Sequence, residues 1–357
     1  MEILMQCRAG FEPDCAQELQ TRVVQGRGQC ICQAEVGSGY VLADAKAPRD
    51  FYGTLHWKEW IFARQWWLVA ARVDLSAADR ITPLVEAAQY ALPEQMVYSE
   101  LVCEFPDTND GRQVTPWLNR FEPLLEKALQ DKGLLNMDGE GPSLRCFFLN
   151  QHDALIGLGT ERSAPWACGF PRLRFPAEAP SRSTLKLAEA FEVFLSPREQ
   201  ELALRAGMHA VDLGAAPGGW TWQLVARGLQ VVAVDNGPMK GGVLGHPSVK
   251  HLRTDGFRFR PERPVEWLVC DMVEQPRRVA ELMRDWVREG FARQAIFNLK
   301  LPMKIRLDEV RACLQIIETG ALENGLRVKL WARQLYHDRE EVTVYMRVEG
   351  KAKKNIW

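Results

Sequence analysis

The sequence predicts an α/β protein. Its carboxyl-terminal half is expected to be a Rossmann-like, mostly parallel seven-stranded sheet, preceded by an α+β region. Three observations support this. After residue 181, short apolar runs alternate with helical segments. A glycine-rich turn, Val211 to Trp220, joins one of those runs to a helix. Four prolines between residues 165 and 180 separate this half from the preceding region, and predict a linker over 166–180.

The amino-acid composition is typical of a globular protein. The chain has 357 residues, 46% hydrophobic and 25% charged, which is ordinary for a globular protein. A formal net charge of −1 excludes a global basic field, so local patches would have to meet any polyanion. The nine cysteines include no C-x-x-C pair, so we expect reduced thiols and no metal site. No apolar run approaches about 18 residues, and no signal peptide is evident. We therefore expect a soluble, cytoplasmic protein that contacts no membrane.

Residues 1–55 are expected to form a small α+β, ferredoxin-like unit. Ile3 to Cys7 predicts a strand, and a helix is expected to follow Glu12. Two β-like runs then flank Gly37–Gly39, which is typical of a hairpin turn.

Residues 56–165 are expected to form a second α+β unit. A strand is predicted over 62–69, and Thr82-Pro83 predicts a capped helix start. Thr115 begins another helix, which Pro123 is expected to break or kink. A hairpin closes the unit. These patterns by themselves indicate no function.

Residues 181–357 carry the predicted parallel sheet. A helix is expected over 181–191, and another over 276–289. The last two strands, joined by a short turn, are expected to add an antiparallel strand. The strand-like runs are 210–213, 230–234, a run just before Asp255, 267–270, 295–299, 327–332 and 342–348.

The turn G-A-A-P-G-G, from Gly214, favours a bound nucleoside. Glycines allow close backbone approach to a ligand, and the following helix points its N-terminus at it. The dinucleotide fingerprint G-x-G-x-x-G is absent, which favours S-adenosylmethionine over NAD. The cofactor-binding candidates here are Ala216, Pro217, Gly218 and Gly219. The alternative is a tight turn that only packs a strand on a helix.

Two aspartates near strand ends extend this prediction. Asp235 ends the second strand, 23 positions after Asp212, where a carboxylate can accept hydrogen bonds from ribose hydroxyls. Asp255 lies near the end of the third strand and can accept from an adenine amino group. For each, an ordinary turn aspartate is the alternative.

Four charged residues are expected to meet at one sheet edge. Asp271, Lys300 and Glu341 lie at or beside the ends of three strands, and Lys186 comes from the helix that enters the domain. From position alone, a structural ion-pair network is the favoured interpretation.

Short sequence motifs favour a functional site over a structural ion-pair network. The loop D-L-G-A-A-P-G-G-W, S-R-S-T-L-K from Ser181, C-D-M from Cys270 and R-E-E-V from Arg339 resemble the FtsJ-like RNA ribose 2′-O-methyltransferases. The Lys-Asp-Lys-Glu tetrad of that family corresponds to Lys186, Asp271, Lys300 and Glu341, with Glu340 leaving the glutamate ambiguous by one position. The resemblance implies S-adenosylmethionine as cofactor, with Ser183 and Asp271 joining the loop, Asp235 and Asp255 in its site.

Longer sequence motifs resemble the branch of this family that acts on large-subunit ribosomal RNA. They include C-R-A-G-F-E from Cys7, D-R-I-T-P from Asp79 and F-N-L-K-L-P-M-K from Phe297. The resemblance implies a THUMP RNA-binding domain over 56–165, a methyltransferase domain over 181–357 and a cytidine 2′-hydroxyl of 23S rRNA as substrate. We expect no DNA partner and a monomer.

The expected chemistry explains the residue types. A ribose hydroxyl must lose its proton as it attacks, and Lys300 can take that proton only if its pKa falls well below about 10.4. Burial and the charge of Lys186 lower this pKa, whereas Asp271 and Glu341 raise it, and the sequence leaves the balance open.

Alternative functions predict other sequence motifs. A non-catalytic nucleotide- or RNA-binding protein would be expected to lose part of the tetrad, and an NAD-type oxidoreductase would carry G-x-G-x-x-G. An amino-directed methyltransferase usually carries N-P-P-Y or D-P-P-Y where this chain has D-M-V-E, from Asp271. A cytosine-C5 enzyme typically has a nucleophilic cysteine after proline, and no P-C pair exists.

Overall fold

The computed structural model describes residues 1–92 and 96–351. The chain divides into two compact units, Met1–Phe170 and Pro171–Trp357. Within the described ranges, none of the helices combines the length and the apolar character that crossing a bilayer requires.

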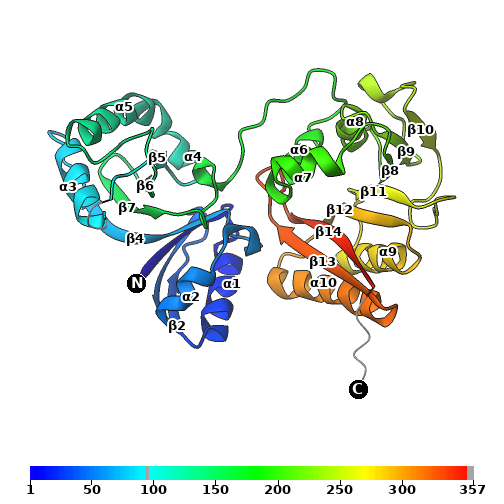
Figure 1. The fold of residues 1–357 in the computed structure, drawn as a ribbon, viewed down its shortest axis with the longest axis horizontal. Coiled ribbons are helices and arrows are strands. Elements are labelled where there is room, and N and C mark those ends of the chain that lie inside the picture. Colours follow the sequence, from blue (N-terminus) through cyan, green and yellow to red (C-terminus); the bar gives the residue numbers. More distant parts are fainter. Residues whose placement is uncertain (93–95, 352–357) are drawn as a thin grey trace. The chain divides into compact units, whose positions relative to one another are not determined.

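A single seven-stranded sheet organises the amino-terminal unit, in the order β2-β3-β1-β4-β7-β6-β5 (Figure 1). Its elements are β1 (Glu2–Gln6), α1 (Glu12–Gln25), β2 (Gln29–Gln33), β3 (Tyr40–Lys46), α2 (Arg49–Thr54), η1 (Trp57–Glu59), β4 (Gln65–Asp74), α3 (Ile81–Ala91), β5 (Glu100–Glu104), α4 (Asn109–Arg112), α5 (Thr115–Asp131), β6 (Ser143–Phe148), β7 (Asp153–Gly159) and η2 (Ala167–Gly169).

The two predicted amino-terminal units share this sheet. Strand β1 pairs antiparallel with β4, with Leu4 opposite Trp67. One buried cluster combines Leu4 and Trp67 with Phe147 of β6. No break in the sheet therefore coincides with the boundary expected at residue 55, because strands from both sides of it pack into one core.

Three local expectations in this unit were wrong. Strand β4 begins at Gln65 rather than at residue 62. Helix α3 begins at Ile81, so its N-cap is Arg80 rather than Thr82, and Asp79 Oδ1 accepts from the backbone N–H groups of Ile81 and Thr82 at 3.0 Å. The break expected at Pro123 does not occur, because helix α5 continues through it. A proline removes one backbone hydrogen bond, and here a buried stripe keeps the helix whole. That stripe is Leu118, Phe121, Leu125 and Leu129.

The carboxyl-terminal unit is the predicted α/β fold. Its elements are α6 (Thr184–Phe194), α7 (Pro197–Ala203), β8 (His209–Leu213), α8 (Gly219–Val225), β9 (Gln230–Val234), η3 (Gly241–Val243), β10 (Val249–Leu252), β11 (Val265–Cys270), α9 (Pro276–Arg288), β12 (Ala292–Lys300), α10 (Arg306–Glu323), β13 (Leu326–Arg333) and β14 (Glu341–Lys351).

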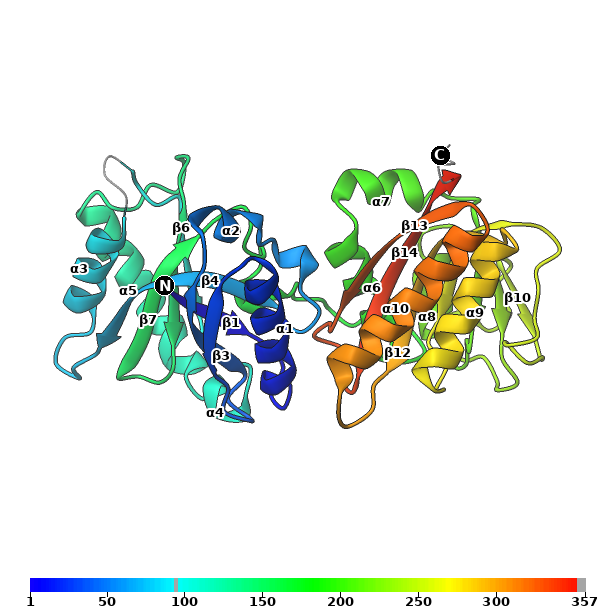
Figure 2. The same ribbon diagram turned by 90° about the horizontal axis from the view of Figure 1, so that it is seen from below.

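Its sheet has the order β10-β9-β8-β11-β12-β14-β13. The pairs among β8 to β12 are parallel, and β14 runs antiparallel to both β12 and β13. The mostly parallel seven-stranded prediction is confirmed. Helices α9 and α10 cover one face, and α6 and α8 cover the other (Figure 2). The strand order reverses beside β8, so ligands are expected at the carboxyl ends of β8 and its neighbours.

Candidate active site

Four charged side chains form a closed ring near the carboxyl ends of β11 and β12. We call this cluster the ring of charges, and its members are Lys186, Asp271, Lys300 and Glu341. Lys300 Nζ lies 2.8 Å from Asp271 Oδ1 and 3.0 Å from Glu341 Oε2. Lys186 Nζ lies 3.7 Å from Asp271 Oδ2 and pairs directly with Glu341 Oε1. Each lysine therefore bridges the same two carboxylates. The structure brings together all four residues that the sequence analysis singled out.

Strand direction explains why a glutamate at the start of β14 reaches this edge. Strand β14 is antiparallel to β12, and Glu341 is the register partner of Lys300, the last residue of β12. Glu340 instead pairs with Arg306 at 3.1 Å, and its side chain is 64% exposed. The register thus selects Glu341 over its neighbour.

The ring is mostly buried, and its charges shift the pKa values of Lys300 and Glu341. Burial alone would lower the pKa of Lys300, but Asp271 and Glu341 outweigh it and raise this pKa above its ordinary value. Burial would raise the pKa of Glu341, but Lys186 and Lys300 outweigh it and lower this pKa. The balance that the sequence left open therefore favours a protonated Lys300 in the ligand-free protein.

Polar residues beneath the ring escaped the sequence analysis. Asn298 Nδ2 donates to Asp271 Oδ1 at 2.8 Å, and Thr343 Oγ1 donates to Asn298 Oδ1 at 2.8 Å. Both side chains are fully buried. One signal was available, because Asn298 is a polar residue inside an apolar strand and shares a strand face with Lys300 two positions later.

A cavity of about 340 Å³ adjoins the ring at the ends of β8, β9 and β11. Asp271 belongs to both, and three other predicted cofactor-binding residues also line the cavity. Its lining is Gly214, Ala216, Val234, Asp235, Asn236, Thr254, Asp255, Gly256, Phe257, Asp271, Met272, Val273 and Glu274.

Backbone N–H groups hold the two predicted nucleoside acceptors in place. Asp235 Oδ2 accepts from the Ala216 N–H at 3.0 Å, and Asp235 Oδ1 accepts from the Gly237 N–H at 2.6 Å. Asp255 Oδ1 accepts from the Phe257 N–H at 2.9 Å. Each carboxylate keeps further lone pairs for a ligand hydroxyl or amino group.

The glycine loop needs small residues. Gly214 (φ 76°) and Gly218 (φ 113°) adopt left-handed backbone conformations. A Cβ at Gly214 would lie 2.6 Å from Met272 Cγ, and one at Gly219 would lie 2.3 Å from Ser183 Oγ. Ser183, Pro217, Gly218 and Gly219 are not among the residues that line the cavity. They support the loop and the start of α8.

A buried carboxylate lies under this loop. Asp212 Oδ2 accepts from Thr221 Oγ1 at 2.6 Å, whereas its Oδ1 has no hydrogen-bond partner among the described residues. Burial raises the pKa of Asp212 to about 7. The loop of small residues and the carboxylate acceptors Asp235 and Asp255 in the cavity lining fit a nucleoside.

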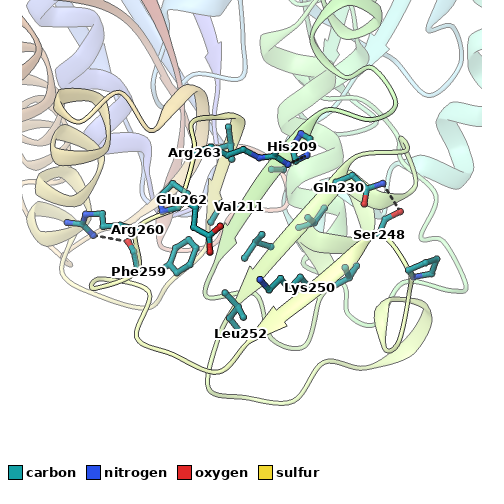
Figure 3. Close-up of a pocket in the computed structure, with 17 residues that line it drawn as sticks. His209, Val211, Gln230, Ser248, Lys250, Leu252, Phe259, Arg260, Glu262 and Arg263 are labelled. Atoms are coloured by element: carbon teal, nitrogen blue, oxygen red, sulfur yellow. Dashed lines mark hydrogen bonds between the residues drawn. The ribbon is translucent and has the colours of Figure 1, made fainter.

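Another cavity, of about 410 Å³, lies over the β8-β9-β10 face and contains none of the predicted site residues. Val211, Gln230 and Lys250 point into it from the three strands, and Phe259 and Glu262 line its wall (Figure 3). Within the described ranges, no group of three His, Cys, Asp or Glu side chains is arranged to hold a metal ion.

Three family models match the chain. The RlmM ferredoxin-like domain matches residues 1–67, and the amino-terminal model of ribosomal RNA large subunit methyltransferase M matches 79–160. The FtsJ-like methyltransferase model matches 179–317.

Full-length relatives agree with these models. Ribosomal RNA large subunit methyltransferase M of Laribacter hongkongensis is 51% identical over 344 residues, 96% of each chain. The protein of the same name from Methylococcus capsulatus is 47% identical over 349 residues, 96% of this chain and 97% of that protein. The crystal structure of TrmN from Thermus thermophilus covers 98% of this chain and 99% of its own at 16% identity, with a TM-score of 0.36.

Proposed function

The chain belongs to the family of ribosomal RNA large subunit methyltransferase M, and from that premise we propose its substrate atom and its base. Family membership makes it an S-adenosylmethionine-dependent ribosomal RNA methyltransferase and confirms the resemblance found in the sequence. Beyond this, we propose that it methylates the ribose 2′-hydroxyl of a cytidine in 23S rRNA, with Lys300 as general base.

One observation carries the proposal: Asp271 joins the ring of charges to the cofactor cavity. Its Oδ1 holds Lys300 Nζ at 2.8 Å, and the same residue lines the cavity. A base and a bound methyl donor are therefore positioned by one side chain. Catalysis of an in-line transfer depends mainly on such alignment.

The cavity residues fit S-adenosylmethionine, which supplies a methyl group activated by its sulfonium charge. We propose that Asp235 accepts from the ribose hydroxyls and Asp255 from the adenine amino group. Ala216, Pro217, Gly218, Gly219 and Ser183 shape the loop that holds the amino-acid end, and Asp271 marks the end of the cavity that faces Lys300.

Lys300 begins the cycle with its proton. Asp271 and Glu341 raise its pKa, so the neutral amine is a minor species at pH 7 in the ligand-free protein. Lys300 must lose this proton before its Nζ accepts the proton of the attacking 2′-hydroxyl. Lys186 works in the opposite direction to the carboxylates, because a second cation in the ring disfavours a protonated Lys300. The reaction rate is therefore expected to increase with pH.

The amino-terminal half is proposed to bind the RNA. The family model over 1–67 supports a ferredoxin-like unit at the start of the chain. We propose that this unit spans 1–55, that a THUMP domain spans 56–165 and that a linker follows over 166–180. We propose that the protein acts in the cytoplasm, on a ribosomal RNA substrate. We propose that it acts as a monomer, with neither DNA nor a membrane as partner.

A methyl-transfer assay tests the proposed function. The purified protein is incubated with labelled S-adenosylmethionine and 23S rRNA from cells that lack it, and the product is digested to nucleosides. Label in 2′-O-methylcytidine supports the proposal. Label on a base, or in another ribose, contradicts it. Loss of label with a 16S rRNA control shows selection of the large-subunit RNA.

A further inference from the structure

A chain of buried hydrogen bonds connects the ring of charges to Asp338. We propose that Asp338 is a neutral carboxylic acid that donates its proton to Thr343, so that Thr343 and Asn298 hold Asp271 in one orientation. Asp338, Thr343 and Asn298 are then positioning residues for the methyl transfer. The inference rests on the proposed function and adds a second titrating group to it.

All three side chains are fully buried, with 0% exposure. Thr343 Oγ1 lies 2.9 Å from Asp338 Oδ2 and 3.1 Å from Asp338 Oδ1. On its other side, Thr343 Oγ1 lies 2.8 Å from Asn298 Oδ1. Asn298 and Thr343 are register partners on β12 and β14, and Asp338 lies in the turn that precedes β14. Tertiary structure therefore fixes the order Asp338, Thr343, Asn298, Asp271.

The orientation of Asn298 is determined by its neighbours. Asp271 Oδ1 accepts from both Asn298 Nδ2 and Lys300 Nζ, each at 2.8 Å. A reversed amide would place its oxygen against this carboxylate oxygen, which repels it. The amide oxygen of Asn298 therefore faces Thr343 and needs a donor there.

Counting protons then fixes the state of Asp338. The Thr343 hydroxyl has one proton but lies at hydrogen-bond distance from two acceptors, Asn298 Oδ1 and the Asp338 carboxyl group. If the proton goes to Asn298, the contact with Asp338 is favourable only when Asp338 donates. If Asp338 is ionised, it takes the proton, and Asn298 Oδ1 then faces an oxygen lone pair at 2.8 Å. The neutral acid alone satisfies both contacts.

The surroundings of Asp338 agree with this assignment. Burial raises the pKa of Asp338 to about 8, and the nearby carboxylate of Glu341 acts in the same direction. Lys186 on α6 and the Leu335 N–H oppose it, whereas Glu189 on α6 supports it. The charged groups on the neighbouring elements also include His337, which contacts Glu189 at 2.6 Å, and the buried Arg333, the register partner of Thr343 on β13.

The consequence is a loss of alignment at high pH. When Asp338 ionises, Thr343 turns its proton toward Asp338 and Asn298 loses its donor. The amide of Asn298 is then held only on its Asp271 side, so it fixes Asp271 less firmly, and Asp271 in turn holds Lys300. The methyl-transfer step should therefore slow as pH passes about 8, independently of the proton lost from Lys300.

The test compares wild type with Asp338→Asn, because asparagine donates to Thr343 but cannot ionise. Single-turnover rates of methyl transfer are measured from pH 6.5 to pH 9. We expect a ratio of variant to wild-type rate near one at pH 6.5 and about tenfold at pH 9, because an acid with a pKa near 8 is about nine-tenths ionised there. The ratio cancels any titration of Lys300. A flat ratio, or an inactive but folded variant at pH 6.5, would overturn the inference.

Two variants of Thr343, one without and one with a hydroxyl group, form a matched pair. Thr343→Val keeps the shape of the side chain without its hydroxyl and should lower kcat at least tenfold, with the affinity for S-adenosylmethionine unchanged. Thr343→Ser keeps the hydroxyl and should restore most of the rate. Equal rates for the valine and serine variants would contradict a hydrogen-bonded relay.

A readout that needs no activity separates this inference from the proposed function. Carbon-13 NMR of aspartate-labelled protein should show a carboxyl carbon that titrates near pH 8 and is missing from Asp338→Asn. If that variant does not fold, the signal is assigned from its displacement in Thr343→Ser. A signal that titrates below pH 6 overturns the inference. If the wild type transfers no methyl group while the signal titrates near pH 8, the proposed function fails and the neutral Asp338 stands.

Discussion

Lys300 and Glu341 are register partners on β12 and β14, and their side chains meet at 3.0 Å. The antiparallel direction of β14 places its first residue beside the last residue of β12. Three charges of the ring are thus fixed at strand ends, where the backbone is held by the sheet, and only Lys186 comes from a helix. Rigid strand ends explain how Asp271, Lys300 and Glu341 keep one geometry in a partly buried site.

Removing the charge of Glu341 should disable the ring. Glu341→Gln leaves Lys186 and Lys300 facing each other with Asp271 as their remaining shared carboxylate, so activity should fall on the order of a hundredfold. Glu340→Gln is the control, because Glu340 is exposed and pairs with Arg306 instead. Rates of methyl transfer by the two variants check this. Equal losses would mean that activity does not depend on the charge of Glu341 in the ring.

Asp235→Ala should weaken binding of S-adenosylmethionine about tenfold to a hundredfold, because hydrogen bonds to a charged group contribute about 1.5–3 kcal/mol. The fold should remain, since Asp235 is only partly buried at a loop. Calorimetry measures the affinity, and circular dichroism checks the fold. Unchanged affinity in a folded variant would remove Asp235 from the site. Tight NADH binding by the wild type would favour an oxidoreductase.

Asp212 makes stability depend on pH. Burial raises its folded-state pKa to about 7, above the ordinary value of about 3.9, so the folded state prefers the protonated form. Its contribution to stability is therefore complete below about pH 4 and is lost as pH rises through 7. Urea unfolding should show that Asp212→Asn gains stability relative to wild type between pH 5 and pH 8. A constant difference between the two proteins would show that Asp212 is ionised throughout.

A truncated chain should separate cofactor binding from RNA binding. Residues 171–357 form one compact unit with the whole seven-stranded methyltransferase sheet. This piece should bind S-adenosylmethionine like the full chain but lose most activity on rRNA. Filter binding to 23S rRNA should weaken in parallel, and binding by the full chain should fall as salt rises. Full activity of the piece would contradict an RNA-binding role for residues 1–165.

The sequence predicted those parts of the molecule that depend on local pattern. Apolar runs located the strands of the carboxyl-terminal sheet, and polar residues at their ends located Asp235, Asp271 and Lys300. Pairing between distant segments was not predictable in this way. The β1–β4 pair joins both amino-terminal units, and the register of β12 on β14 brings Asn298 to Thr343. The break expected at Pro123 was wrong for a similar reason. The sequence shows the backbone hydrogen bond that proline removes, but it does not show the tertiary packing of the buried face that keeps α5 whole.

Substitution of Lys300 by arginine tests the central claim most directly. Arginine preserves the positive charge between Asp271 and Glu341 but keeps its proton at any usable pH, so it cannot act as a base. Single-turnover methyl transfer should be lost in Lys300→Arg and in Lys300→Ala, while both still bind S-adenosylmethionine and rRNA. The wild-type rate should increase with pH below pH 8 as Lys300 loses its proton. An active Lys300→Arg enzyme would contradict the account and leave Lys300 as a group that only positions its neighbours.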